Sequence, residues 1–151
     1  MMLTPHILVG ATIGYKIHNY WFVVIFSIIS HFILDAIPHK EYDIKCLRNG
    51  KLNKDFLKDF SKVAIDGFIG LAIVLLLTGF KDLDYVIVGM IAGAFPDFLQ
   101  FLSFVFNFKI LNLIRKFHHK IHIFNNKDFP YWTTFGSQIS TVILMSVTLL
   151  S

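Results

Sequence analysis

Apolar residues of this chain gather into five runs that are separated by polar stretches. A helix that crosses a membrane needs about 20 mostly apolar residues, and fewer where the segment packs inside a bundle. Four of the runs approach this length, whereas the first is shorter and rich in small residues. The runs cover 3–15, 20–37, 63–79, 84–106 and 131–150. The pattern predicts one all-α transmembrane domain over 1–151, a polytopic bundle of four to five membrane helices.

Two polar connections, 38–62 and 107–130, hold most of the positive charge. Of the 14 lysine and arginine residues, only Lys16 and Lys81 lie outside these connections. Basic loops stay preferentially on the cytoplasmic side of a membrane. Because both connections lie on one side if every run crosses, the sequence predicts two cytoplasmic loops and a location in the cell's inner membrane.

Composition agrees with a membrane protein. Hydrophobic residues make up 55% of the chain and charged residues only 16%, and mean hydropathy is +0.63, whereas a soluble domain has roughly 25% charged residues. These values exclude a disordered chain and argue against a soluble globule. The net charge of +4 belongs to the loops, so the expected partner is the lipid bilayer and no nucleic acid. The single cysteine, Cys46, excludes an intramolecular disulfide and a cysteine-based zinc cluster.

Three aspartates, Asp35, Asp66 and Asp97, interrupt the apolar runs. An uncompensated aspartate near the centre of a bilayer costs roughly 2.5–3.5 kcal/mol on insertion scales. The runs offer almost no basic side chains to pair with them. The aspartates are therefore predicted to share a metal ion or a proton, or to lie close to water.

Six of the seven histidines fall in the same half of the predicted membrane as the aspartates, or just below it, and His18 lies on the other face. His31 and Asp35 are four residues apart, as are His118 and His122, so each pair shares one helix face. Such pairs allow two side chains to bind one ion from a single helix. The spacing therefore favours a metal site.

Small residues and one proline shape the fourth run. Pro96 is expected to kink this helix and to free the carbonyl of Ala92. Small residues allow neighbouring helices to approach closely. The expected contact positions are Gly10, Gly14, Ala64, Gly67, Gly70, Gly89, Gly93 and Ala94. Before the third run, 53–62 has apolar residues at helical spacing, which predicts either a helix along the membrane surface or a solvated loop helix.

Four strings, TPHILVGATIG, SHFILDAIPH, GAFPDF and FHHKIH, occur in this order along the chain. They resemble the small integral-membrane proteins of the membrane-bound metal-dependent hydrolase family, whose ligand pattern is similar to that of all-helical zinc-dependent phospholipase C. The resemblance implies a helical bundle, a zinc-type site and phosphoester hydrolysis. The strings Pro-Asp-x-Asp-His and His-Arg-Gly-x-x-His-Ser of better-known members do not occur here. Carried over residue by residue, the implied metal ligands are His6, His31, Asp35, His39, Asp66, Asp97, His118 and His122.

The predicted function is a membrane-embedded metal-dependent hydrolase that acts on a phospholipid or another phosphoester with a metal-activated water near the cytoplasmic face. One or two Zn²⁺ ions suit these nitrogen and oxygen ligands, with Mn²⁺ or Fe²⁺ as alternatives. Asp66 and Asp97 are the expected catalytic groups, and His119, Arg115 and Lys116 are expected to contact the ligands or the substrate. A proton- or metal-ion transporter and an inactive membrane scaffold are the alternative functions.

Overall fold

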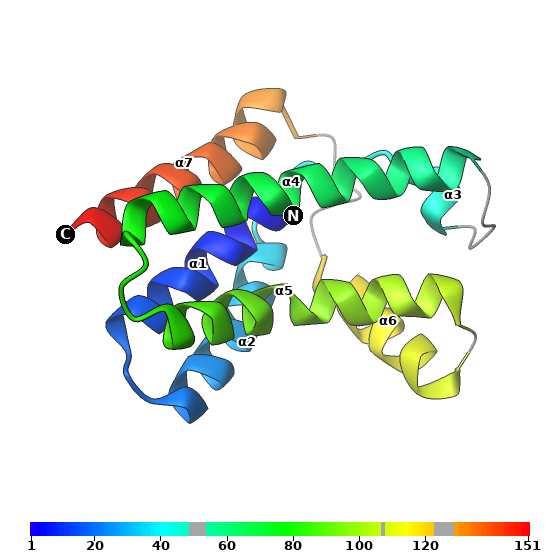
Figure 1. The fold of residues 1–151 in the computed structure, drawn as a ribbon. Coiled ribbons are helices and arrows are strands. Elements are labelled where there is room, and N and C mark those ends of the chain that lie inside the picture. Colours follow the sequence, from blue (N-terminus) through cyan, green and yellow to red (C-terminus); the bar gives the residue numbers. More distant parts are fainter. Residues whose placement is uncertain (49–53, 107, 123–128) are drawn as a thin grey trace.

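A computed structural model describes residues 1–48, 54–106, 108–122 and 129–151 (Figure 1). Within these ranges the chain forms seven helices and no strand, which confirms the predicted all-α class. The helices are α1 (Leu3–Lys16), α2 (Tyr20–Ala36), α3 (Lys45–Arg48), α4 (Lys54–Thr78), α5 (Leu83–Val105), α6 (Lys109–Ile121) and α7 (Tyr131–Leu150).

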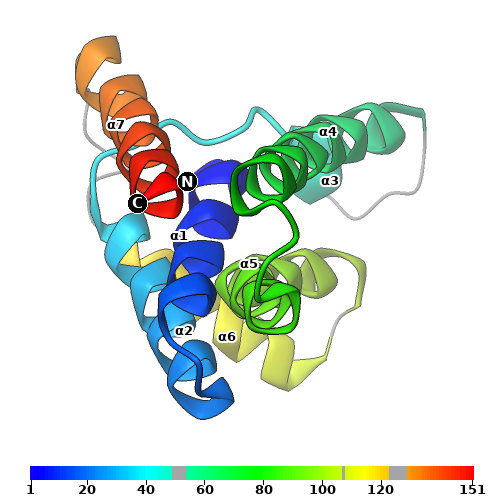
Figure 2. The same ribbon diagram turned by 60° about the vertical axis from the view of Figure 1, so that its left-hand side comes forward.

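Helix α1 lies at the centre of the bundle. It contacts α2, α4, α5 and α7, and Figure 2 shows these helices arranged around it. Leu8 and Ala11 of α1 are wholly buried against Val74, Val86 and Leu149 of the surrounding helices. The first apolar run is therefore covered by protein along its length, which explains how a helix of only 14 residues is accommodated.

Glycines bring α1 and α5 into backbone contact. A Cβ atom added to Gly10 would lie 2.1 Å from the carbonyl oxygen of Gly89, and one added to Gly89 would lie 2.0 Å from that of Gly10. One turn further along α1, a Cβ atom added to Gly14 would lie 2.1 Å from the carbonyl oxygen of Tyr85. Because positions along α1 rise as those along α5 fall, the two helices run antiparallel. The predicted close approach at small residues is confirmed for this pair.

Three helices, α4, α5 and α7, are long and apolar enough to cross a membrane. Helix α2 is apolar but has only 17 residues. The long helices leave large apolar side chains exposed, among them Phe68 (70%), Leu76 (83%) and Ile91 (62%). Extended apolar surface of this kind is typical of a face covered by lipid or by a partner. These features indicate a membrane protein.

The amphipathic segment predicted at 53–62 is not a separate element. From Lys54 onward it forms the first turns of α4 and continues into the apolar part of that helix, while residue 53 lies outside the described residues. Its Phe56 and Phe60 rings lie 6.4 and 5.8 Å from the ring of Phe101 on α5. The apolar face of the segment therefore packs on another helix, although Leu57 remains exposed.

Replacing Gly89 by alanine is expected to destabilise the bundle by about 1–3 kcal/mol, because the added methyl group meets the α1 backbone. Gly136→Ala is the matched control, since a Cβ at this position in α7 meets nothing within 4 Å. This control should leave stability unchanged or raise it by up to about 1 kcal/mol. Unfolding in mixed detergent, followed by circular dichroism, measures both effects, and equal effects would contradict the described contact.

Candidate metal centre

Asp35, near the end of α2, is the centre of a buried cluster of histidines. Its side chain has no exposed surface. Asp35 Oδ2 lies 2.7 Å from His118 Nε2, 3.0 Å from His31 Nε2 and 3.3 Å from His122 Nε2. One carboxylate oxygen therefore faces three imidazole nitrogens that come from two segments far apart in the sequence.

The other carboxylate oxygen, Oδ1, faces α1 and the chain that follows α2. It accepts a hydrogen bond of 2.8 Å from the α-ammonium group of Met1. His6 Nε2 lies 3.3 Å from Oδ1 and His39 Nε2 lies 4.0 Å from it. The His6 ring also stacks on that of His31, with 4.1 Å between the ring centroids. The structure thus brings His6 and His39 to the same carboxylate as the other predicted histidines.

Backbone carbonyls fix the orientation of two of these rings. His31 Nδ1 lies 2.8 Å from the carbonyl oxygen of Gly93, and His39 Nδ1 lies 2.7 Å from that of Ile37. A neutral imidazole that donates from Nδ1 carries its lone pair on Nε2. In their neutral forms, both rings therefore direct an Nε2 lone pair toward the Asp35 carboxylate, as a metal ligand requires. Second contacts of this kind are typical of histidines that bind metal.

The carbonyl that contacts His31 comes from the part of α5 that precedes Pro96. Helix α5 continues through Pro96, and the accepting carbonyl belongs to Gly93, one residue after Ala92. Gly93 is itself buried against α1, where an added Cβ would lie 2.7 Å from the His6 carbonyl oxygen. The close contact between α1 and α5 thus also places the histidines of the cluster.

Glu41 is a site residue that the sequence pattern does not reveal. Its Oε1 lies 3.3 Å from His122 Nδ1, and its other oxygen binds the guanidinium of Arg48. Burial alone would raise the pKa of Glu41, but the neighbouring His122 and Arg48 hold this pKa below its usual range. An ionised Glu41 orients His122 with its Nε2 toward Asp35.

The donor set fits a divalent zinc-type ion. One ligand atom from each of His31, Asp35, Asp97 and His118 lies within 4.8 Å of all the others, and Asp35, His39 and His122 form a second such set. Asp97 Oδ1 is 3.8 Å from the Nε2 atoms of His31 and His118. Two atoms that each bind zinc at about 2.1 Å lie at most about 4.2 Å apart. The two Asp97 separations satisfy that limit, as do those of Asp35 from His31 and His118 in the first set and from His39 and His122 in the second.

A buried nitrogen without a hydrogen-bond partner provides a second test of the fit. His39 Nε2 is buried and makes no hydrogen bond. Burial lowers the pKa of His39 to about 4, so its imidazole is neutral near pH 7 and this nitrogen offers a lone pair. Leaving a buried polar atom unsatisfied costs about 1–3 kcal/mol. A cation beside His39 and Asp35 would remove this cost.

The structure does not place Asp66 in the cluster. The Asp66 carboxylate accepts hydrogen bonds from the Thr4 amide at 2.9 Å, from the Thr4 hydroxyl at 2.8 Å and from the Tyr42 hydroxyl. The Tyr42 hydroxyl in turn accepts from the Leu3 amide at 2.9 Å. Asp66 thus satisfies the free amide of Thr4 at the first turn of α1 and, through Tyr42, that of Leu3. Of the predicted metal ligands and catalytic groups, Asp66 is therefore the one that the structure leaves outside the cluster.

The three predicted substrate contacts line one cavity beside the cluster. Arg115, Lys116 and His119, all on α6, border a cavity of about 750 Å³ that His39 and His122 also border. The guanidinium of Arg115 lies 5.8 Å from the centre of the Phe104 ring, which positions it at the cavity wall. The structure therefore brings these residues together with two members of the cluster.

The cluster geometry is the observation on which a functional assignment of this chain rests. Comparison with family models, with curated proteins and with solved structures finds no match. The resemblance to membrane-bound metal-dependent hydrolases stays a prediction from the four sequence strings.

Tyr42→Phe is expected to lower the free energy of unfolding by about 1–2 kcal/mol without releasing bound metal, because it removes a hydrogen bond to Asp66. Asp66→Asn should have a similar effect, and the double variant should cost less than the sum of the two. Tyr131→Phe, at a residue 72% exposed, is the control. If folded Asp66→Asn protein loses its metal, Asp66 is a metal ligand, and its placement outside the cluster is contradicted.

Proposed function

We propose that this protein is a membrane-embedded, metal-dependent hydrolase of a phosphoester. One observation carries the proposal: His31, His118, Asp35 and Asp97 direct nitrogen and carboxylate oxygen atoms at one buried point. Nitrogen and oxygen donors in this number suit Zn²⁺, and Mn²⁺ or Fe²⁺ accept the same ligands. Such an ion supplies Lewis-acid chemistry for phosphoester hydrolysis.

The residues of the cluster have distinct roles in this proposal. Asp35 belongs to both ligand sets, so its two oxygens can serve two ions or hold one ion firmly. Asp97 differs from the others because its side chain is 26% exposed and borders a cavity. A carboxylate in this position accepts a proton from water at the edge of the site. Asp97 is therefore the proposed general base.

We also propose that α1 and α2 complete the membrane domain beside α4, α5 and α7, with both basic connections in the cytoplasm. The excess of lysine and arginine in these connections supports this orientation. The cluster lies where α2 ends and the first connection begins. In this orientation the site faces the cytoplasmic half of the inner membrane.

Removing one ligand is expected to abolish metal binding and activity together. Purified protein should contain about one or two zinc-type ions per chain, and His31→Gln should lose them along with hydrolysis of a generic phosphodiester. His18→Gln is the matched control, since His18 is 54% exposed and contacts Asp82 instead. Elemental analysis and a phosphodiester assay on the same preparations measure both properties.

The outcomes of this experiment separate the alternative functions. If protein purified without chelator holds no transition metal, the proposed hydrolase function is contradicted. An inactive membrane scaffold then explains the chain better. Bound metal without hydrolysis, together with metal uptake into proteoliposomes, would favour the transporter.

Membrane orientation is testable with single cysteines in a Cys46→Ser background. Lys45→Cys, at a site whose side chain is 87% exposed, should react with an impermeant maleimide only after spheroplasts are permeabilised. Lys81→Cys, on the opposite connection, should react in intact spheroplasts. The reverse labelling pattern would contradict the proposed orientation.

A further inference from the structure

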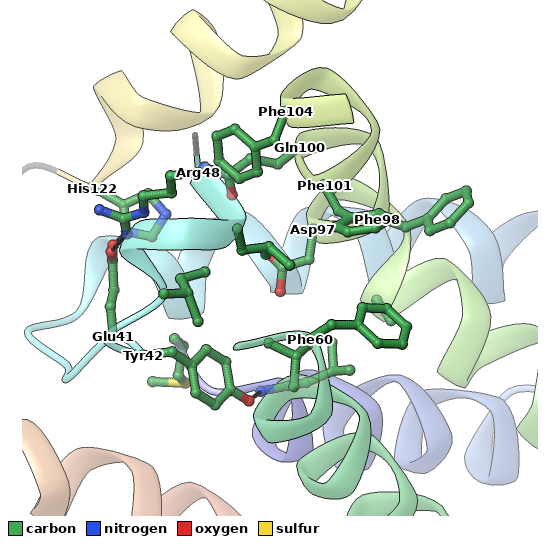
Figure 3. A pocket seen from close by; sticks show the side chains of 16 residues that line it. Glu41, Tyr42, Arg48, Phe60, Asp97, Phe98, Gln100, Phe101, Phe104 and His122 are labelled. Atoms are coloured by element: carbon green, nitrogen blue, oxygen red, sulfur yellow. Dashed lines mark hydrogen bonds and ion pairs between the residues drawn. The ribbon is translucent and has the colours of Figure 1, made fainter. Parts of the chain in front are cut away.

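Two cavities of different character meet at the candidate metal centre. The first has a volume of about 470 Å³ and lies between α4, α5 and the chain around α3. In Figure 3 the aromatic side chains of Phe60 and Phe98 lie at one end of it, and His122, Glu41 and Arg48 lie at the other. This cavity therefore has an apolar end and a polar end.

The apolar end is lined by side chains of α4 and α5. Phe60 on α4 is 42% exposed and Phe98 on α5 is 53% exposed, although both helices are long and apolar enough to cross a membrane. Val63 and Phe101 continue the apolar wall between them. An apolar chain in the bilayer can reach the cavity between these two helices.

The second cavity is cationic. Lys40, Arg48, Arg115 and Lys116 border it, and one carboxylate, Glu41, lies among them and is bound to Arg48. Arg48 and His122 border both cavities. A surplus of positive side chains around a polar cavity favours an anionic group, and arginine suits a phosphate in particular.

We propose that the two cavities together bind one phosphorylated membrane lipid. A single apolar chain occupies the cavity beside Val63 and Phe101, and the phosphorylated headgroup occupies the cationic cavity beside Arg115. The phosphoester then lies at the junction, where His122 and Arg48 border both cavities, and Asp97 borders the first cavity beside it. This assignment rests on the proposed function for the reaction, whereas the binding itself does not depend on hydrolysis.

A soluble phosphoester fits these features less well. It would satisfy the cationic cavity but leave the apolar cavity without an occupant. Ligand sites are typically apolar cavities with a few polar groups that orient the ligand. Here the polar groups Glu41, Arg48 and His122 lie at the end opposite Phe60 and Phe98, as an amphipathic ligand requires, and Asp97 lies between the two ends.

Photocrosslinking tests the binding directly. The full chain is reconstituted in phosphatidylcholine nanodiscs that contain a trace of phosphatidic acid with a diazirine in one acyl chain. Crosslinks mapped by mass spectrometry are expected on Phe60, Phe98 and Phe101. Val63→Phe should reduce this crosslinking about tenfold, because the larger ring overfills the cavity. Ile65→Phe, two residues away on α4 and 59% exposed, should leave it unchanged.

The headgroup is tested by substitution and by competition. Arg115→Gln should reduce the crosslinking about tenfold, as expected for the loss of one charge-assisted phosphate contact, whereas Lys109→Gln, exposed on the same helix, should not. Unlabelled phosphatidic acid should compete, and diacylglycerol and inorganic phosphate should not. Competition by inorganic phosphate as strong as that by the lipid would show a phosphate site without a lipid site and overturn the proposal.

The result also separates this inference from the proposed function. In one result, the protein hydrolyses a soluble phosphodiester but its crosslinks are spread over lipid-facing residues such as Leu76. This result would overturn the lipid site without contradicting the proposed hydrolase function. A different result is a protein that holds no metal and has no activity but still shows crosslinking that Val63→Phe abolishes. This result would support the lipid site and contradict the proposed hydrolase function.

Discussion

The buried charge of Asp35 is the constraint on which the structure around the site depends. A carboxylate removed from water is tolerated only when cations or hydrogen-bond donors surround it. Around Asp35 these partners come from three helices and from the chain beyond them: His6 on α1, His31 on α2 and His118 on α6, together with His39, His122 and the α-ammonium group of Met1. The α-ammonium group of Met1 is one such cation at Oδ1, and a proton or a metal ion between Oδ2 and the imidazole nitrogens would supply another. This need is the physical argument for the proposed metal ion.

Helix α1 connects this cluster to the rest of the bundle. Glycine contacts hold α1 against α5, and the same contacts set His6 beside Gly93 and His31. At its first turn, amide groups that no helical carbonyl can satisfy donate to Gln138 and Asp66. The polar side chains of Asp66 and Gln138, which lie inside apolar helices, are thereby explained: they accept hydrogen bonds from the start of α1. The centre of the bundle combines tight backbone packing with a small number of polar contacts.

Local features of the site could be predicted from the sequence, and long-range ones could not. The pairs His31/Asp35 and His118/His122 follow from helical periodicity, and α7 begins and ends at the predicted residues. Asp66 looks the same as Asp35 in the sequence, because both interrupt apolar runs. Only the folded chain shows that Thr4 and Tyr42 surround one and histidines surround the other. Glu41 and Arg48 lie in a connection without periodicity, so the contacts of Glu41 with His122 and with Arg48 depend on tertiary structure.

X-ray absorption at the zinc edge of the purified, zinc-loaded protein would report the ligands of a metal ion at Asp35. We expect a first shell of nitrogen and oxygen at about 2.0–2.1 Å with the outer-shell scattering of at least two imidazoles. The same spectrum should be absent from Asp35→Asn protein, which lacks the carboxylate that both ligand sets share. A shell of water oxygens without imidazole scattering, or a sulfur ligand from Cys46, would contradict a metal centre built on Asp35.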